Sequence, residues 1–252
     1  MSAGAPATVH LVGAGPGAAD LLTLRAARLL GEADIVFHDA LVPREILGFA
    51  TGRLVPVGKR SGRHATAQAF INKRLADAAR RHRVVVRLKG GDPMLFGRAQ
   101  EEIDHLVQEG IRVEVVPGVT AALAASADLA VSLTRRGLAR SVTFVTPRAA
   151  PGAPENGWVR AVLAADTAAI YMGSGEAGAI AAALLRAGKP AATPVAVVEN
   201  ASRPDSVIRC GRLEALPMLA PRETSGPALI LLGEAYRAAV AAPLRRTASQ
   251  AA

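Results

Sequence analysis

The chain has 252 residues, half of them hydrophobic and a fifth charged, which suits one large α/β unit or two smaller lobes with a real core. It contains no uncharged apolar run of about 18 residues, so no membrane-spanning helix is expected. Residues 1–8 lack the basic and apolar segments of a secretory signal. The single cysteine, Cys210, excludes an internal disulfide and fits a reducing, cytoplasmic compartment.

The formal net charge of +9 would suit a nucleic acid, an anionic membrane or an acidic small ligand. Aromatic residues make up only 3% of the chain, and proteins that bind single strands usually stack the bases on aromatic side chains. We therefore expect no nucleic acid as a partner, and without a long apolar run we expect no membrane either. An acidic small molecule and an ordinary solvated surface remain as explanations of comparable weight.

Short β-branched runs alternate with Ala- and Leu-rich stretches at helical spacing, which predicts an α/β fold with largely parallel sheets. A change to Pro, Gly, Ala and Asn near residues 147–157 indicates a connection between an N-terminal lobe, residues 1–140, and a C-terminal lobe, residues 150–240. Residues 241–252 are predicted to be a disordered tail. The predicted strands cover residues 9–12, 34–38, 83–88, 112–116, 141–146, 168–172, 194–198, 206–211 and 228–232.

The predicted helices follow from caps and apolar spacing. Thr23 should cap a helix that carries Leu24, Ala27 and Leu30 on its inner face, and Thr66 should cap the next one. Further helices are predicted at residues 97–109, with Ile103, Leu106 and Val107 facing inward, and at residues 177–187. The last two strands have no long helix between them, so the second lobe is expected to be partly antiparallel.

The first candidate site is the glycine-rich turn at residues 13–17, where a strand runs into a helix. Glycine lets backbone N–H groups approach a ligand closely. Gly13, Gly15 and Ala18 also satisfy the dinucleotide pattern GxGxxG/A, and Asp39 ends the next strand where a ribose-binding acid could lie. A nicotinamide or flavin enzyme is therefore an alternative at this point, and a tight turn without a ligand is a weaker one.

Two further strand ends carry glycine. Gly90, Gly91 and Asp92 follow the strand at residues 83–88, where Asp92 could accept a hydrogen bond from a ribose hydroxyl or cap the helix near residue 97. The third strand end reads Pro-Gly-Val-Thr-Ala-Ala at residues 117–122, where Thr120 could cap a helix or meet a ligand. A second glycine loop with an acid is not part of a dinucleotide fingerprint, and we favour a functional loop over a turn that merely needs glycine.

A basic loop at residues 57–64 contains Lys59, Arg60, Arg63 and His64. A solvated surface loop is the ordinary explanation for such a charge run. Its glycines and Ser61 indicate a shaped loop, which could bind a polycarboxylate through charge-assisted hydrogen bonds. Further cations that could assist it are Lys89, Arg98, Arg135, Arg136 and Arg140.

Taken together, these motifs resemble those of the uroporphyrinogen-III C-methyltransferases, in the tetrapyrrole methylase family, over about residues 9–233. The stretches that carry the resemblance are GAGPG followed by LLTL, HDALV, GKRSGRH, RLKGGDPMLFGR, VPGVTAA, YMG, ENASRPD and GPALILLGE. The resemblance implies two α/β lobes of the tetrapyrrole methylase type with the ligand cleft between them, in a homodimer. It also implies transfer of methyl groups from S-adenosylmethionine to rings A and B of uroporphyrinogen III, without a metal. The products would be precorrin-2, for cobalamin or sirohaem synthesis, and S-adenosylhomocysteine.

The resemblance also implies roles for residues that match the family motifs. Asp39 would be the proton acceptor and Lys59 the proton donor, while Arg60, Arg63 and His64 would meet the carboxylates of the tetrapyrrole. The implied cofactor-binding residues are Pro16, Gly90, Gly91, Asp92, Leu95, Thr120, Ala121, Met172, Ala201 and Ala228.

The chain departs from the family pattern at three places. Ala18 and Ala19 stand where an acid and a proline are usual, Arg135 replaces a histidine, and Pro147–Arg148 replaces a Gly-His pair. These departures bear on the exact substrate, so another precorrin methyltransferase is the near alternative. A nicotinamide-dependent oxidoreductase and a non-catalytic basic binding module are the remaining ones.

Overall fold

The computed structural model describes residues 8–57, 68–148, 157–220 and 226–241. The chain forms two compact units, residues 1–120 and 121–252, and each is described by itself. Residues 121–140, expected in the first lobe, thus belong to the second unit, because the helix α5 (Ala121–Asp128) packs against that unit's sheet. Within the described residues, no helix combines the length and the apolar character that crossing a membrane requires.

The first unit contains a five-stranded sheet in the order β3-β2-β4-β1-β5, and every neighbouring pair is parallel. The strand β3 is missing from the predicted set, because this short edge strand buries only Val55 and so shows no apolar pattern. All the other strands of this sheet are where the sequence predicts them, within one residue at each end. The strands are β1 (Thr8–Gly13), β2 (Ile35–His38), β3 (Arg53–Pro56), β4 (Val84–Lys89) and β5 (Arg112–Val116).

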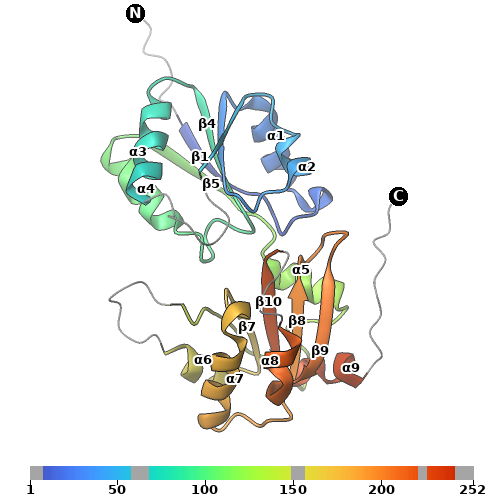
Figure 1. The fold of residues 1–252 in the computed structure, drawn as a ribbon. Helices are drawn as coiled ribbons and strands as arrows, with labels where there is room; N and C mark the ends of the chain where they lie inside the picture. Colours follow the sequence, from blue (N-terminus) through green and yellow to red (C-terminus); the bar gives the residue numbers. More distant parts are fainter. Residues whose placement is uncertain (1–7, 58–67, 149–156, 221–225, 242–252) are drawn as a thin grey trace, which may run out of the picture. The chain divides into compact units, whose positions relative to one another are not determined.

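Helices cover both faces of this sheet (Figure 1). The short 3₁₀ helix η1 (Ala19–Leu21), α1 (Leu24–Glu32) and α2 (Arg44–Leu47) lie on one face. On the other face lie α3 (Gln68–Ala79) and α4 (Ala99–Gln108). The result is an α/β/α unit in which the central strand β4 is buried along almost its whole length.

Some helix predictions are confirmed and others are wrong. Thr23 caps α1, since its Oγ1 accepts a hydrogen bond of 3.2 Å from the backbone N–H of Ala26. The prediction of the inner face of α1 is wrong, because Leu24 is 91% exposed and the buried side chains are Ala26, Leu29 and Leu30. Val107 on α4 is likewise exposed, next to a fully buried Leu106. The predicted cap Thr66 lies outside the described residues.

The second unit contains a five-stranded sheet in the order β6-β7-β10-β8-β9. Only β6 and β7 are parallel, whereas β10 runs antiparallel to both β7 and β8, and β9 antiparallel to β8. The expectation of a partly antiparallel second lobe is therefore confirmed. The strands are β6 (Val142–Val145), β7 (Thr167–Tyr171), β8 (Pro194–Glu199), β9 (Val207–Arg212) and β10 (Ala228–Gly233).

Two groups of helices cover the second sheet (Figure 1). One face packs against α6 (Trp158–Ala164), α7 (Ala177–Arg186) and α8 (Leu216–Leu219). The 3₁₀ helix η2 (Ser174–Glu176) precedes α7, and η3 (Leu213–Ala215) precedes α8. The other packs against α5 and η4 (Glu234–Tyr236), where Tyr236 is fully buried. The last helix, α9 (Arg237–Ala241), ends where the predicted tail begins, and residues 242–252 lie outside the described part.

Each unit uses one aspartate to join the starts of two parallel strands. In the first, Oδ2 of Asp34 accepts hydrogen bonds of 2.9 Å from the backbone N–H groups of Val84 and Arg83. In the second, Oδ2 of Asp166 accepts from the N–H groups of Arg140 and Ser141, at 2.8 and 3.0 Å. The hydrogen bonds from Val84, which has the larger effect, and from Arg83 lower the pKa of the Asp34 carboxyl from its ordinary value.

We expect Asp34→Asn to lower the free energy of unfolding at pH 7 by up to about 1 kcal/mol, since Asp34 is exposed and solvent screens its charge. The folded-state pKa lies below the unfolded one, so the contribution is present above about pH 4 and is lost as pH falls through the folded pKa. Urea unfolding at pH 7 and pH 3 should show the difference between variant and wild type narrowing in acid. Asp104→Asn, which removes a carboxylate bonded to the side chain of Gln100, is the control. An equal difference at both pH values would contradict the charge argument.

Candidate active site

Three glycine-bearing loops meet at one edge of the first sheet. Because β1, β4 and β5 are parallel, the loops after their last residues lie together. The approach is backbone to backbone: a Cβ added to Gly118 would lie 2.4 Å from the carbonyl oxygen of Gly91 and 2.9 Å from Cα of Gly13. A Cβ on Gly13 would lie 2.6 Å from Cα of Gly118. No side chain fits at either position.

Hydrogen bonds hold these loops together. Gly15 and Gly91 exchange two backbone hydrogen bonds, of 3.1 and 2.7 Å. The two carboxylate oxygens of Asp92 accept from the backbone N–H groups of Met94, at 2.8 Å, and Gly118, at 2.9 Å. Asp92 therefore joins two of the loops and does not cap α4, whose N-cap is Arg98. Each oxygen has a further lone pair, so Asp92 can still accept a hydrogen bond from a ligand.

The other predicted cofactor residues of the first unit surround these glycines. Pro16 lies between two glycines with positive φ, Gly15 and Gly17. The backbone of Gly90 is exposed, and a Cβ on Gly91 would meet nothing within 4 Å, although its φ of +66° favours glycine. Leu95 and Thr120 are partly exposed on the loops after β4 and β5. The edge thus offers open backbone on which a ligand could lie.

Asp39 reaches the same edge from the end of β2. Its backbone N–H donates to the carbonyl of Leu88 at 3.2 Å, beside the glycine loop that follows β4. Its side chain is 30% exposed, and Oδ1 accepts a hydrogen bond of 2.5 Å from Nη2 of Arg87. None of the described residues donates a hydrogen bond to the other oxygen, Oδ2. The predicted proton acceptor therefore has one oxygen held by a cation and one available.

Behind Asp39 lies a buried network of charges that the sequence prediction missed. Glu102 on α4 is fully buried, and its Oε1 accepts from Nε of Arg87 at 3.1 Å and from Nζ of Lys89 at 3.0 Å. Nε2 of Gln68 on α3 donates to the same oxygen at 3.0 Å. Burial, followed by the charge of Arg87, lowers the pKa of Lys89, while Glu102 raises it.

Lys89 was expected among the cations that could meet a substrate, and this is wrong. Its side chain is buried and paired with Glu102, so it does not reach a polycarboxylate. Two features of the sequence could have shown the network. Arg87 and Lys89 lie two residues apart, hence on one face of a strand that is otherwise apolar, and Glu102 stands in the buried stripe of α4 with Ala99 and Leu106.

The predicted residues of the second unit also gather at one edge of their sheet. The strand β10 runs against β7 and β8, so its first residues lie beside the last residues of those strands. Ala228 pairs with Glu199, at the end of β8, and Leu229 pairs with Tyr171, at the end of β7. This places Ala228, Met172 and Ala201 at a common edge.

The start of α5 joins this second edge through a hydrogen bond. The backbone N–H of Ala122 donates to the hydroxyl of Tyr171 at 3.1 Å, which brings Ala121 beside the end of β7. Met172 follows Tyr171 with a φ of +57°, a left-handed conformation that is uncommon for a residue other than glycine, and its side chain is 41% exposed. Ala201 is buried. The structure therefore gathers the predicted cofactor residues into two groups, one in each unit.

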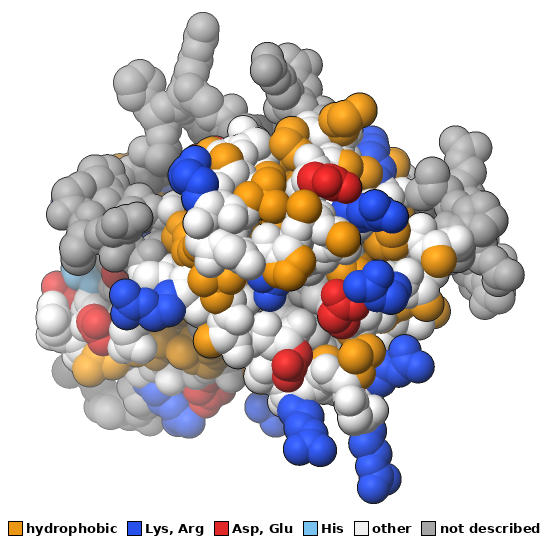
Figure 2. All heavy atoms as spheres, turned by 90° about the horizontal axis from the view of Figure 1, so that it is seen from below, with side chains coloured by type: hydrophobic (Ala, Val, Ile, Leu, Met, Phe, Trp, Pro, Cys, Tyr) orange, Lys and Arg blue, Asp and Glu red, His pale blue; other side chains and the backbone are white. Residues whose placement is uncertain are grey.

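The basic loop lies outside the described residues, so Lys59, Arg60, Arg63 and His64 stay predictions. Of the other expected cations, Arg98 is exposed in the first unit and pairs with Glu101 at 2.7 Å. Arg135, Arg136 and Arg140 are exposed in the second unit, not in the first lobe where they were expected. On the face drawn in Figure 2, the Lys and Arg side chains of the described residues are spread among acidic and apolar ones and form no single basic cluster.

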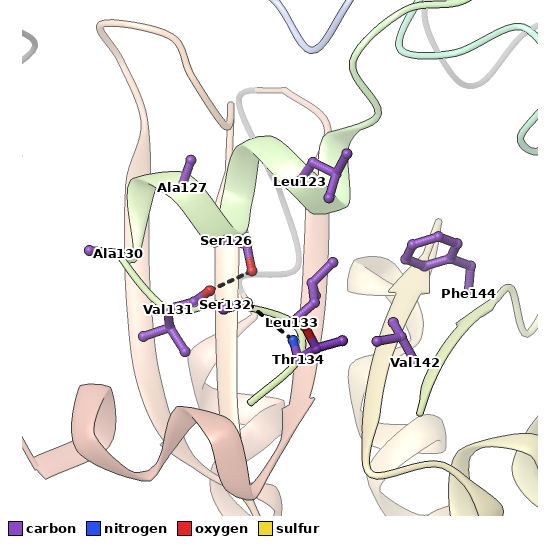
Figure 3. Close-up of a pocket in the computed structure, with 10 residues that line it drawn as sticks. All are labelled: Leu123, Ser126, Ala127, Ala130, Val131, Ser132, Leu133, Thr134, Val142 and Phe144. Atoms are coloured by element: carbon purple, nitrogen blue, oxygen red, sulfur yellow. Dashed lines mark hydrogen bonds between the residues drawn. The ribbon is translucent and has the colours of Figure 1, made fainter. Parts of the chain in front are cut away.

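The second unit also contains a mostly apolar pocket of about 470 Å³. Figure 3 shows its walls, with Leu123 and Ser126 on α5, Leu133 in the segment after it, and Val142 and Phe144 on β6. The hydroxyl of Ser126 donates to the carbonyl of Val131 at 2.7 Å and so fixes that segment against α5. None of the predicted site residues that the structure describes lines this pocket.

Several known proteins are similar to this chain. A siroheme synthase of Chromobacterium violaceum is 44% identical over 229 residues, which cover 90% of this chain and 49% of that protein. A siroheme synthase of Pseudomonas entomophila is 44% identical over 232 residues, covering 91% of this chain and 50% of that protein. This chain therefore spans about half the length of these curated relatives.

Among solved structures, the uroporphyrin-III C-methyltransferase of Thermus thermophilus in complex with S-adenosylhomocysteine is 42% identical, with a TM-score of 0.81. The match covers 92% of this chain and 99% of that chain. A cobalt precorrin-4 methyltransferase is 27% identical with a TM-score of 0.77, covering 90% of this chain and 95% of that one.

The model of the family described as tetrapyrrole (corrin/porphyrin) methylases matches residues 8–217. This range includes both groups of predicted cofactor residues except Ala228. The chain belongs to the tetrapyrrole methylases.

Proposed function

We propose that this protein is an S-adenosylmethionine-dependent methyltransferase that methylates uroporphyrinogen III on rings A and B, giving precorrin-2 and S-adenosylhomocysteine. The observation that carries the proposal is the meeting of the Gly13, Gly91 and Gly118 backbones at one sheet edge, next to Asp39. The similarity to the uroporphyrin-III C-methyltransferase of Thermus thermophilus supports it.

The proposed cofactor residues fit the ligand chemically. A flat adenosine can lie on backbone that carries no side chain, as at Gly90 and Gly91, and ribose hydroxyls can donate to Asp92. In the first unit the proposed residues are Pro16, Gly90, Gly91, Asp92, Leu95 and Thr120; in the second they are Ala121, Met172, Ala201 and Ala228. S-adenosylmethionine supplies an electrophilic methyl group when it is bound.

The work left to the protein is alignment and the movement of a proton. The reduced tetrapyrrole is an electron-rich carbon nucleophile, and holding two reactants in line can lower a barrier by about 7–11 kcal/mol in good cases. We propose that Asp39 accepts the proton that the ring loses, through Oδ2, which is available at the sheet edge. Lys59 is the proposed proton donor, and Arg60, Arg63 and His64 the proposed partners of the substrate carboxylates. We also propose that the protein acts as a homodimer in the cytoplasm.

A later precorrin methyltransferase is the second candidate. The similarity to a cobalt precorrin-4 methyltransferase favours it, as do the departures at Arg135 and at Pro147–Arg148. A nicotinamide-dependent oxidoreductase, in contrast, rested on the first glycine loop alone, and membership of the tetrapyrrole methylases replaces that interpretation.

The proposed function can be tested by incubating the purified protein anaerobically with uroporphyrinogen III and isotopically labelled S-adenosylmethionine. We expect a doubly methylated product, identified by its mass, and S-adenosylhomocysteine. A product with one methyl group, or activity only on an already methylated precorrin, would favour the second candidate. Failure to transfer label to any tetrapyrrole would contradict both.

We expect Gly118→Ala to abolish measurable binding of S-adenosylhomocysteine in isothermal titration. The new methyl group would lie 2.4 Å from the carbonyl oxygen of Gly91, a backbone atom that can move only with its loop, so we also expect a loss of about 1–3 kcal/mol in stability. Gly178→Ala on α7 is the matched control, since a Cβ there meets nothing within 4 Å. It should bind as the wild type does and be slightly more stable. Wild-type affinity in Gly118→Ala would show that this edge is not the cofactor site.

We expect Asp39→Asn to lower kcat by about 100-fold or more, in the range usual for loss of a general base. The affinity for S-adenosylhomocysteine should stay within about twofold of wild type, because the amide keeps the shape and the hydrogen bond from Arg87. Steady-state kinetics and titration of the same preparation measure both. A fall in cofactor affinity as large as the fall in kcat would assign Asp39 to the cofactor instead.

A further inference from the structure

The buried acid Glu102 lies directly behind the proposed proton acceptor. It is fully buried and about a helical turn inside α4, yet it accepts hydrogen bonds from Arg87, Lys89 and Gln68. A buried carboxylate needs such partners, because an unpaired charge in the interior is strongly unfavourable. Its partners include the arginine that binds Asp39, which makes a continuous path from α4 to the sheet edge.

The guanidinium of Arg87 joins three elements at once. Its Nε donates to Glu102 at 3.1 Å, its Nη1 donates to the backbone carbonyl of Leu88 at 3.1 Å, and its Nη2 donates to Asp39. A guanidinium is planar and rigid, so fixing two of its nitrogens fixes the direction of the third. Arg87 is only 3% exposed, and solvent therefore cannot substitute for these partners.

Charge balance makes Glu102 the partner on which the others depend. Arg87 and Lys89 are two buried cations on one face of β4, and Asp39 and Glu102 are their carboxylate counterparts. Glu102 stands between the two cations and binds both. Without its charge, Arg87 and Lys89 would repel each other, and Asp39 would be the remaining carboxylate of this network.

We propose that Glu102 is a positioning residue: through Arg87 it holds the Asp39 carboxylate in place, with Oδ1 bound and Oδ2 presented for proton transfer. This inference rests on the proposed role of Asp39 and adds the residue that orients it. Lys89 balances the charge of Glu102 and does not meet substrate. The series of hydrogen bonds thus runs from α3 and α4 through Arg87 on the central strand β4 to Asp39.

The decisive experiment is a double-mutant cycle in kcat between Glu102→Gln and Asp39→Asn. We expect Glu102→Gln to lower kcat by about 10- to 100-fold, the loss that a misplacement of about 1 Å can cause, with KM and the affinity for S-adenosylhomocysteine within about twofold of wild type. If Glu102 acts through Asp39, adding Glu102→Gln to Asp39→Asn lowers kcat little further. Multiplicative losses in the double variant would overturn the proposal.

Two companion variants separate positioning from folding. Arg87→Lys keeps the positive charge but cannot bridge Glu102 and Asp39 in a fixed plane, so its kcat should fall as in Glu102→Gln, which covers the case in which Glu102→Gln does not fold. Glu109→Gln is the matched control. Glu109 lies at the exposed C-terminal end of α4 and forms an ion pair with Arg80, which follows α3. The kcat of this control should equal that of the wild type. A wild-type kcat in Arg87→Lys would contradict the proposal.

A crystal structure of Glu102→Gln provides a readout that does not depend on the reaction. We expect the Arg87 guanidinium to turn and the Asp39 carboxylate to leave its present position. An unmoved Asp39 would overturn the positioning role and leave the proposed methyltransferase intact. Conversely, if the wild-type protein methylates no tetrapyrrole, the proposed function fails while this structure still tests the link from Glu102 to Asp39.

Discussion

The backbone contact between Gly13, Gly91 and Gly118 is the constraint on which the first unit depends. Three parallel strands end where their loops touch without any side chain between them. The paired hydrogen bonds of Gly15 with Gly91 and the bridge from Asp92 to Gly118 need that approach. The same approach leaves the backbone at Gly90 and Gly91 open. It also positions Asp39, because Asp39 donates a backbone hydrogen bond to Leu88 on the strand that leads into this loop.

The charge network behind this edge is unusual for the interior of an α/β unit. Buried ion pairs contribute little net stability, since desolvation offsets most of the Coulomb attraction. Apolar side chains would serve the core equally well, as Val9 and Leu11 of β1 do beside Val85 and Arg87. The network is therefore better explained by the orientation it imposes on Asp39 than by the stability of the fold. Its four formal charges cancel, which lets all of its members remain buried or half-buried.

Strand positions and the α/β class could be predicted because buried β-branched runs and Gly or Pro at their ends are local signals. The strand β3 could not, since an edge strand with one buried residue has no apolar pattern. Spacing alone also wrongly predicted that Leu24 is buried. Residues three apart do not stay on one face of a helix with 3.6 residues per turn, and the packing of α1 on the sheet decides which of its side chains are buried. The charge network was missed for a related reason: Arg87 and Glu102 lie 15 residues apart on different elements, and only the packing of α4 on the sheet brings their side chains together.

The strand order β3-β2-β4-β1-β5 has a consequence for synthesis of the chain on the ribosome. In the described structure β1 pairs with β4 and β5, and never with the strand that follows it in sequence. The mostly apolar strand Thr8–Gly13 must therefore wait for Val84–Lys89 to emerge before it gains its first partner strand. Closing such a long loop is slow, and an unpaired apolar strand is prone to aggregate meanwhile. The first unit is thus expected to need protection from chaperones until Val116 has left the exit tunnel.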